Sequence, residues 1–343
     1  MAQQRVHYEI GGIPKDYSDY PEWVRTAEAT GFDGVGCGDS STLWTDPFVT
    51  LSIAAQNSKR LGLGVTGTNP LTRHPVVAAA ASQSVQMISG GRFHYALGSG
   101  DSAVANIGQP RARMADLEAY ATAVRGLTAG ESVTWRGQAL RMNWNTPRVP
   151  VLLCAEGPRT QRLAGRMSDG VVLYNGLTPE VLTASINNVR EGAREAGRNA
   201  DELQYRTIVV FQMCDDIAKG REAVKFSLAG TANRAFRNSL FDKMVPEHLH
   251  AGFRGLQSEY RSSHHQQLGE HSFNAALLDK YGLADYLIER FAVIGPPRHC
   301  AERLKEIASY GLTHISLSIL AQTPREQMDS MRIVADEVFP HLR

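Results

Sequence analysis

The stretch GVTGTNPLTRHP, at residues 64–75, lies between an apolar run at 61–63 and an alanine-rich segment at 76–88. The flanking patterns predict a strand that leads into a helix. An ordinary connection of this kind takes a few residues and ends in one capping residue. This one holds two glycines, three threonines, one asparagine and two prolines. We therefore expect it to do more than connect the two elements.

The same alternation of apolar runs and helical patterns continues along the chain. Most of the runs are continuously apolar, which is typical of strands covered on both faces in a parallel sheet. The eight predicted strands are residues 6–10, 34–38, 61–67, 93–98, 151–155, 171–174, 207–213 and 314–319, and a helical segment follows each. Eight such units predict an α/β fold, a (β/α)8 TIM barrel. A doubly wound open sheet is the alternative, but no GxGxxG motif follows the first strand to favour it.

Two segments interrupt the alternation. Residues 130–148, before the fifth strand, resemble a hairpin with Arg136 and Gly137 at its turn. Residues 230–290 form a long polar insertion before the last strand–helix unit. Since no Pro/Ser/Gly-rich linker divides the chain, we expect a single domain over residues 1–343 with two insertions.

The amino-acid composition excludes several classes of protein function. Hydrophobic residues make up 43% of the chain and charged residues 21%, as in a globular protein with a large core. The net charge of +1 indicates neither a nucleic acid nor a membrane surface as partner. The four cysteines form no CxxC pair and the N-terminus has no apolar signal region. We expect a cytoplasmic enzyme that acts on a small-molecule substrate.

The loops that follow the strands carry the candidate site, because ligands of a parallel barrel bind at the C-terminal ends of its strands. Glu9 is expected at the end of the first strand and Asp39 at the tip of the second. The fourth and fifth strands end in GSGDSAV (98–104) and AEGPRTQRLAG (155–165), which have the form of anion cradles. Plain tight turns are the alternative for either loop. Four unusual loops on one rim favour a bound cofactor with a phosphate.

Three segments resemble the bacterial-luciferase-like superfamily, most closely its methylenetetrahydromethanopterin-reductase-like branch. They are TNPLTRHPVVAAAASQSVQMISGGRFHYALGSGDSAV (68–104), AEGPRTQRLAGRMSDGVVL (155–173) and ERFAVIGPPRHCAERLKEIASYGLTHISLSI (289–319). The resemblance implies a (β/α)8 barrel that binds FMN or the deazaflavin F420 at its C-terminal rim. It also implies a homodimer, since most members dimerise.

The resemblance assigns roles to residues of four loops. It implies that the third strand ends in a bulge with a non-proline cis peptide that supports the flavin ring, here at Thr66–Gly67. Where relatives often have valine, this chain has glycine at position 67. The residues implied in cofactor binding are Asp39 near the ring, Thr66, Gly67, Thr68 and Asn69 at the bulge, Gly98, Ser99, Gly100 and Asp101 along the tail, and Glu156, Gly157, Pro158 and Arg159 at the phosphate.

Candidates for proton transfer are Glu9, His264 and His265. Glu9 resembles a carboxylate of the reductase branch, and pairing with a nearby arginine is its structural alternative. The two histidines follow Tyr260, where related sequences often carry histidines, and a solvated loop is their alternative. No metal site is expected, because His248 and His250 are too closely spaced for a helical pair and no cysteine is near them.

Three functions are compatible with these residues. The first is a flavin-dependent monooxygenase that takes reduced FMN from a separate flavin reductase and uses O₂ to oxygenate a small organic substrate. The second is an F420-dependent oxidoreductase that moves a hydride to or from a small substrate. The third is a non-catalytic barrel that binds flavin or another phosphate ligand. Ser40, where F420-dependent dehydrogenases often have histidine, favours the first, and the branch resemblance favours the second.

Overall fold

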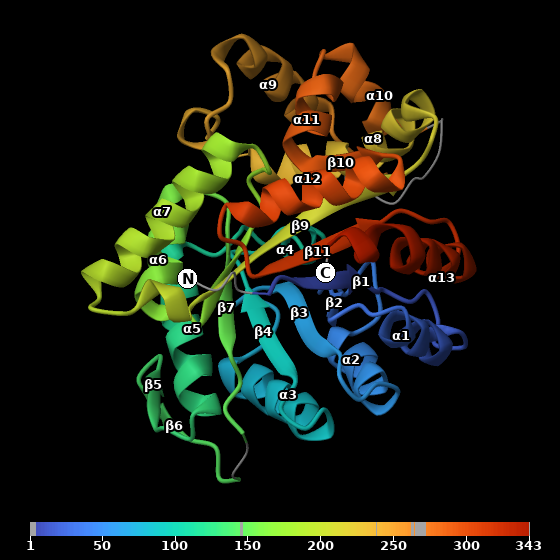
Figure 1. Ribbon diagram of the computed structural model, residues 1–343. Helices are drawn as coiled ribbons and strands as arrows, with labels where there is room; N and C mark the ends of the chain where they lie inside the picture. Colours follow the sequence, from blue (N-terminus) through green and yellow to red (C-terminus); the bar gives the residue numbers. More distant parts are fainter. Residues whose placement is uncertain (1–4, 145–146, 238, 262–263, 265–271, 343) are drawn as a thin grey trace.

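Eight parallel strands close into a barrel in the computed structural model, which describes residues 5–144, 147–237, 239–261, 264 and 272–342. The strands are β1 (His7–Gly11), β2 (Gly34–Cys37), β3 (Gly62–Thr68), β4 (Phe93–Leu97), β7 (Val151–Ala155), β8 (Gly170–Leu173), β9 (Gln204–Met213) and β11 (His314–Ile319). They neighbour one another in the order β9-β11-β1-β2-β3-β4-β7-β8, and β8 pairs back with β9. Helices surround this barrel (Figure 1). The predicted (β/α)8 TIM barrel is confirmed.

The helices of the outer ring often begin with proline, whose fixed φ suits the first helical position. They are α1 (Tyr20–Ala29), α2 (Pro47–Gln56), α3 (Pro75–Ile88), α4 (Ser102–Ala105), α5 (Met114–Thr128), α6 (Pro158–Met167), α7 (Pro179–Glu195), α8 (Ile217–Ala235), α12 (Pro297–Ser309) and α13 (Pro324–Ile333). Asp46 caps α2 by accepting hydrogen bonds from the backbone N–H groups of Phe48 and Val49. Within the described ranges, no helix has the length and apolar character needed to cross a bilayer.

The two segments that interrupt the alternation have regular structure. β5 (Val133–Trp135) and β6 (Gln138–Leu140) form the expected hairpin, and Arg136 and Gly137 both have positive φ at its turn. In the second insertion, α9 (His250–Glu259), α10 (Phe273–Lys280) and α11 (Ala284–Phe291) pack beside α8 at the top of Figure 1. They share with α8 a hydrophobic cluster separate from the main core.

The structure adds one strand that the sequence pattern did not predict. β10 (Ala292–Gly295) pairs in parallel with the last part of β9, residues 210–213. It lies on the edge of β9 that β8 leaves free, because β8 pairs only with residues 204–207. A run of four residues directly after a helix is too short to predict as a strand from periodicity. The proline-led start of α12 that follows it is the signal that the other strand–helix units share.

The barrel interior has room for polar side chains because small residues face it on β2 and β3. A Cβ on Gly34 would lie 2.7 Å from Oε1 of Glu9, and one on Gly64 would lie 2.0 Å from Nε2 of His94. Gly36 leaves the same kind of space for Thr66. The outward faces of these strands pack against the helices in the main core instead. The glycines of GVG and GLG therefore allow a polar interior layer.

The opening stretch forms the end of β3 as an irregular strand. The register with β4 shifts between Thr66 and Thr68, so a β-bulge is present as expected. The expected cis peptide at Thr66–Gly67 is wrong, since no described peptide bond is cis. Gly67 has φ +123°, a conformation open to glycine but strained for other residues. Glycine thus produces the bulge through its own φ, with a trans peptide.

Interior glycines should be sensitive to a single added methyl group where the interior is filled. We expect Gly64→Ala to lower the free energy of unfolding by about 1–3 kcal/mol, because its Cβ would overlap the His94 ring. Gly62→Ala, two residues earlier on β3, is the matched control, since its Cβ would meet nothing closer than 3.5 Å. Urea unfolding of both variants measures the difference, and equal stability would contradict this account of the interior.

Candidate functional site

Acidic and basic side chains converge at the loops after β4 and β7. Glu156, directly after β7, lies 3.3 Å from Nε of Arg234, 3.9 Å from Nζ of Lys243 and 4.0 Å from Nη1 of Arg111. These three cations come from α8, from the turn that follows α8 and from the segment before α5. Segments far apart in sequence therefore meet at one carboxylate.

Asp101, at the start of α4, is the second carboxylate of this cluster. It accepts a hydrogen bond from Nη2 of Arg111 at 2.7 Å and lies 3.5 Å from Nη1 of Arg237. Burial opposes its ionisation, but Arg111, Arg234 and Arg237 outweigh burial and hold the pKa of Asp101 below its usual value. The carboxylate is therefore ionised at neutral pH.

We call these six residues the cationic cluster: Asp101, Arg111, Glu156, Arg234, Arg237 and Lys243. Four cations face two carboxylates, so the cluster carries two surplus positive charges. It lies where the predicted phosphate loops end, and α6 begins beside it at Pro158. Positive charge and a helix N-terminus together favour an anionic ligand.

The bulge of β3 is linked to the cationic cluster through Tyr174. The Tyr174 hydroxyl donates a hydrogen bond to the backbone oxygen of Thr66 at 2.8 Å. The guanidinium of Arg234 lies over the Tyr174 ring, 4.5 Å from its centroid. A Cβ on Gly67 would be in ordinary contact with Cys154 and Tyr174. The predicted ring support and the predicted anion site thus adjoin one another.

The loop after β4 is held to the bulge by its backbone. The N–H of Gly98 donates to the oxygen of Thr68 at 2.9 Å, and the N–H of Ala112 donates to the oxygen of Ser99 at 2.8 Å. Gly100 has φ +97°, which favours glycine at this turn. The loop is therefore tied both to β3 and to the segment that carries Arg111.

Two buried polar residues flank the bulge. Asp39 accepts hydrogen bonds from Thr68 Oγ1 at 2.6 Å and from Arg73, whose other nitrogen contacts Asp46. The Asp39 carboxylate therefore holds the opening stretch against β2. Asn69 accepts from two backbone N–H groups of its own turn, while its buried Nδ2 has no hydrogen-bond partner among the residues that the structure describes. A buried amide donor without a partner is costly and is available to a ligand.

Glu9 lies inside the barrel rather than free at its mouth. It is the third of five residues in β1, and both its oxygens are 2.8 Å from Nη1 of Arg206 on β9. The expected position at the strand end is therefore corrected, and pairing with arginine is what the structure shows. His94 lies in the same layer, where burial and then the charges of Arg206 and His314 lower its pKa well below the usual value.

The remaining predicted residues are placed as follows. His264 packs its ring against Phe273 of α10 at a centroid distance of 5.8 Å. His265 lies outside the described residues. Gly157 caps α6 and Pro158 begins it, while Arg159 is exposed beyond them. No group of metal-binding side chains occurs among the described residues.

Sequence reasoning missed the four cations of the cluster and Arg206. Arg234, Arg237 and Lys243 belong to the end of α8 and the start of the insertion, so they follow no strand directly. Arg111 lies ten residues beyond Asp101, and their pairing depends on how the intervening loop folds. An arginine within the apolar strand β9 was the one visible signal for the partner of Glu9.

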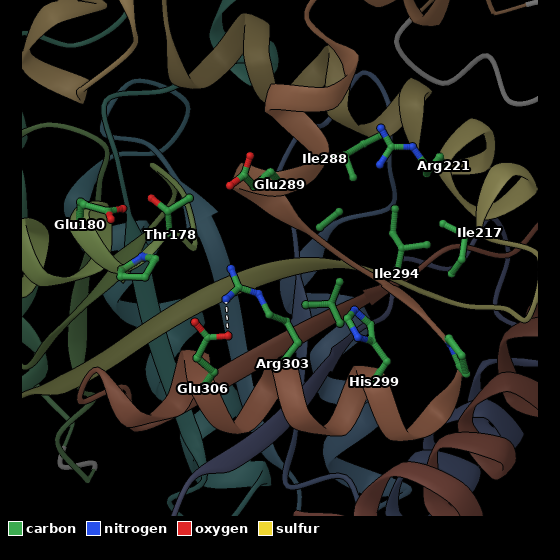
Figure 2. A pocket seen from close by; sticks show the side chains of 14 residues that line it. Thr178, Glu180, Ile217, Arg221, Ile288, Glu289, Ile294, His299, Arg303 and Glu306 are labelled. Carbon is green, nitrogen blue, oxygen red and sulfur yellow. Dashed lines mark ion pairs between the residues drawn. The ribbon is translucent and has the colours of Figure 1, made fainter.

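A separate groove of about 840 Å³ lies between β10, α12 and the first turns of α7 and α8 (Figure 2). None of the predicted site residues that the structure describes lines it. Its arginines are paired locally, Arg303 with Glu306 and Arg221 with Asp285. We place the candidate site at the cationic cluster instead, because charge and strand ends converge there.

Breaking the Glu9–Arg206 pair should destabilise the barrel. Arg206→Met leaves Glu9 buried without a partner, and we expect a loss of about 3–5 kcal/mol in the free energy of unfolding. Adding Glu9→Gln to that variant should recover part of the loss, since no isolated charge then remains. Guanidinium unfolding of the two single variants and the double variant measures this. A double variant whose loss equals the sum of the single losses would contradict the pairing.

Comparisons with known proteins place this geometry in a family. The chain is 29% identical over 305 residues to a 5,10-methylenetetrahydromethanopterin reductase of Methanolobus tindarius, covering 85% of this chain and 87% of that protein. It is 26% identical over 366 residues to the protein of the same name from Methanopyrus kandleri, covering 98% and 99%. The solved coenzyme F420 dependent tetrahydromethanopterin reductase from Methanopyrus kandleri has the same fold, with a TM-score of 0.75 at 22% identity over 99% of this chain and 100% of that one.

The family model described as luciferase-like monooxygenase matches residues 1–314, which covers the whole barrel up to the start of β11. The resemblance seen in the three segments of the sequence is therefore confirmed. This chain belongs to the luciferase-like monooxygenase family.

Proposed function

We propose that this protein is an F420-dependent oxidoreductase that moves a hydride between the deazaflavin and a carbon atom of a small substrate. Two relatives that align over most of the chain are reductases by name, and a solved structure of the same fold is described as F420 dependent. The monooxygenase interpretation has support from the description of the whole family and from solved structures of the same fold that are 14% to 19% identical. We therefore favour the F420-dependent oxidoreductase over the flavin-dependent monooxygenase.

The observation that carries the proposal is the surplus positive charge of the cationic cluster beside the β3 bulge. F420 joins a planar ring to an anionic tail that contains a phosphate. Arg111, Arg234 and Lys243 surround Glu156 at the loop where that tail would bind. The Nδ2 of Asn69, which has no partner within the described part of the chain, offers a donor close to the bulge. The cations around Glu156 and the Asn69 amide are therefore both suited to bind F420.

Each part of the site has a distinct task in this proposal. F420, when bound, supplies the hydride chemistry. Thr66, Gly67 and Thr68 would support its ring, and Tyr174 holds that backbone in place through its hydrogen bond to the Thr66 oxygen. The cations of the cluster would bind its anionic tail. The Glu9–Arg206 pair lies in the interior layer of the barrel, where each side chain keeps the other's buried charge compensated.

For proton transfer we keep the histidine candidates predicted from the sequence, His264 and His265. His264 lies beside α10 in the insertion, and His265 follows it in the chain. A histidine suits this task because its ordinary pKa lies near neutrality. Glu9, the other predicted candidate, is paired with Arg206 inside the barrel, which favours its structural alternative over proton transfer.

Cofactor titration tests the function. We expect F420 to bind with a dissociation constant below about 1 μM and reduced FMN at least tenfold more weakly, as measured by fluorescence quenching under anaerobic conditions. Arg111→Gln should weaken F420 binding strongly, because it removes a contact to both carboxylates of the cluster. Arg298→Gln, an exposed arginine of α12, is the control and should leave affinity unchanged.

The other outcomes of this titration are equally informative. Tighter binding of reduced FMN, with oxygen consumption that depends on an added flavin reductase, would support the monooxygenase instead. Failure to bind either cofactor would leave the non-catalytic barrel as the remaining function.

We also propose a homodimer formed through α2 and α3. These neighbouring helices contain no Asp, Glu, Lys, Arg or His, although both lie on the outer ring of the barrel. Val77, Met87 and Val49 are 55%, 54% and 51% exposed. A charge-free apolar face of this kind is typical of an interface between identical subunits. A second copy of the chain is the partner that such a face fits.

A charge placed on this face should separate the subunits. We expect the wild-type chain to be a dimer by light scattering and Val77→Lys combined with Met87→Lys to be a monomer, because two lysines would have to be buried unpaired. Ile333→Lys, at an exposed apolar position of α13, should remain dimeric. A monomeric wild type, or a dimeric double variant, would contradict the proposed interface.

A further inference from the structure

Arg290, near the end of α11, is buried with an exposed fraction of 2% and binds three backbone oxygens. Its Nε donates to Asn175 at 2.7 Å, its Nη2 to Lys243 at 2.5 Å and its Nη1 to Met244 at 3.3 Å. Nη1 also contacts the hydroxyl of Tyr286. One side chain thus joins α11, the segment after β8 and the turn after α8.

A glycine at position 176 leaves the space that the Arg290 side chain occupies. Gly176, next to Asn175, has φ +134°, and a Cβ there would lie 2.7 Å from Cγ of Arg290. Any residue other than glycine would therefore be strained and would collide with the arginine. The backbone of the segment after β8 approaches Arg290 closely because position 176 has no side chain.

The turn that Arg290 holds is itself unusual. Met244 adopts the left-handed conformation with φ 57°, which is uncommon for a residue other than glycine. Such a conformation persists where surrounding contacts impose it. Arg290 binds the oxygens of both Lys243 and Met244, so it supplies contacts of this kind.

Lys243 points from this turn into the cationic cluster. Its Nζ donates to the backbone oxygen of Ala235 and lies 3.9 Å from Glu156. Its Cε would be 3.8 Å from a Cβ on Gly157, the residue that caps α6. Burial lowers the pKa of Lys243; Glu156 opposes this, and Arg111, Arg290 and Arg234 add to the lowering. A nearby anion would relieve the repulsion among these cations.

We propose that Arg290 is a positioning residue that sets the affinity of the anion site by fixing the Lys243 side chain against Glu156 and the start of α6. Arg290 does not bind the ligand itself, because it is buried and its donors are directed to Asn175, Lys243, Met244 and Tyr286. This inference rests on the proposed function only in that the site binds an anion. A purely structural Arg290, which stabilises the insertion without affecting Lys243, is the competing account.

A double-mutant cycle separates the two accounts. The variants are Lys243→Gln, Arg290→Lys and their combination, with inorganic pyrophosphate and F420 as separate probes in calorimetric titrations. We expect each single variant to weaken binding about tenfold and the double variant to be no weaker than Lys243→Gln alone, since residues that act as a unit are not additive. A double variant weakened by the product of the two single effects would overturn the proposal.

Salt dependence provides a readout that a structural role would not change. Arg290→Lys keeps the charge of the chain, yet it should flatten the salt dependence of binding as Lys243→Gln does, because Lys243 no longer faces the anion. Tyr286→Phe is the control for stability, since it removes one contact of Arg290 and leaves those to Lys243 and Asn175. It should lower the melting temperature with less than about twofold change in affinity.

The pyrophosphate and F420 titrations test the role of Arg290 and the proposed cofactor separately. Pyrophosphate binding with the expected cycle, but no F420 binding, would refute the proposed cofactor and leave the role of Arg290 standing. Absence of pyrophosphate binding to the wild-type chain would overturn the inference, because no anion site would then exist for Lys243 to serve.

Discussion

The ion pair between Glu9 and Arg206 is the contact on which the barrel interior depends. It connects β1 to β9, residues 197 positions apart in the chain, across the inside of a closed sheet. Two charges removed from water are tolerated only when each compensates the other. Their side chains need space, and Gly34 provides it on the neighbouring strand. The buried ion pair therefore depends on the glycine at position 34, because a side chain there would occupy the space of Glu9.

Above this layer, the site is assembled from loops that the barrel alone would not bring together. The fourth and fifth loops supply Asp101 and Glu156, but the balancing cations come largely from α8 and the turn after it. The insertion over residues 230–290, which includes the end of α8, thus completes the charge of the site and contributes most of a second hydrophobic cluster. Arg290 links these two tasks, because the same guanidinium that packs among aromatic rings of the insertion holds the Lys243 turn.

Much of the fold could be predicted because its signals are local. Continuous apolar runs, proline-led helices and glycine turns mark each strand–helix unit within about twenty residues. β10 escaped prediction since four residues carry too little periodicity, and it becomes a strand only by pairing with the exposed edge of β9. The bulge at Gly67 was expected, but with the wrong peptide geometry, because the choice between a cis bond and a positive φ depends on surrounding contacts.

The sequence by itself determined the barrel, the family and the loops that form the rim, since strand order and turn chemistry follow from patterns between near neighbours. Only the tertiary structure decided which charges meet. Glu9 is paired rather than free, Asp39 is bound by Arg73, and the cations of the cluster come from segments that no motif connects. Electrostatic interactions depend on distances in space, and those distances are set when the closed barrel and its insertion pack together.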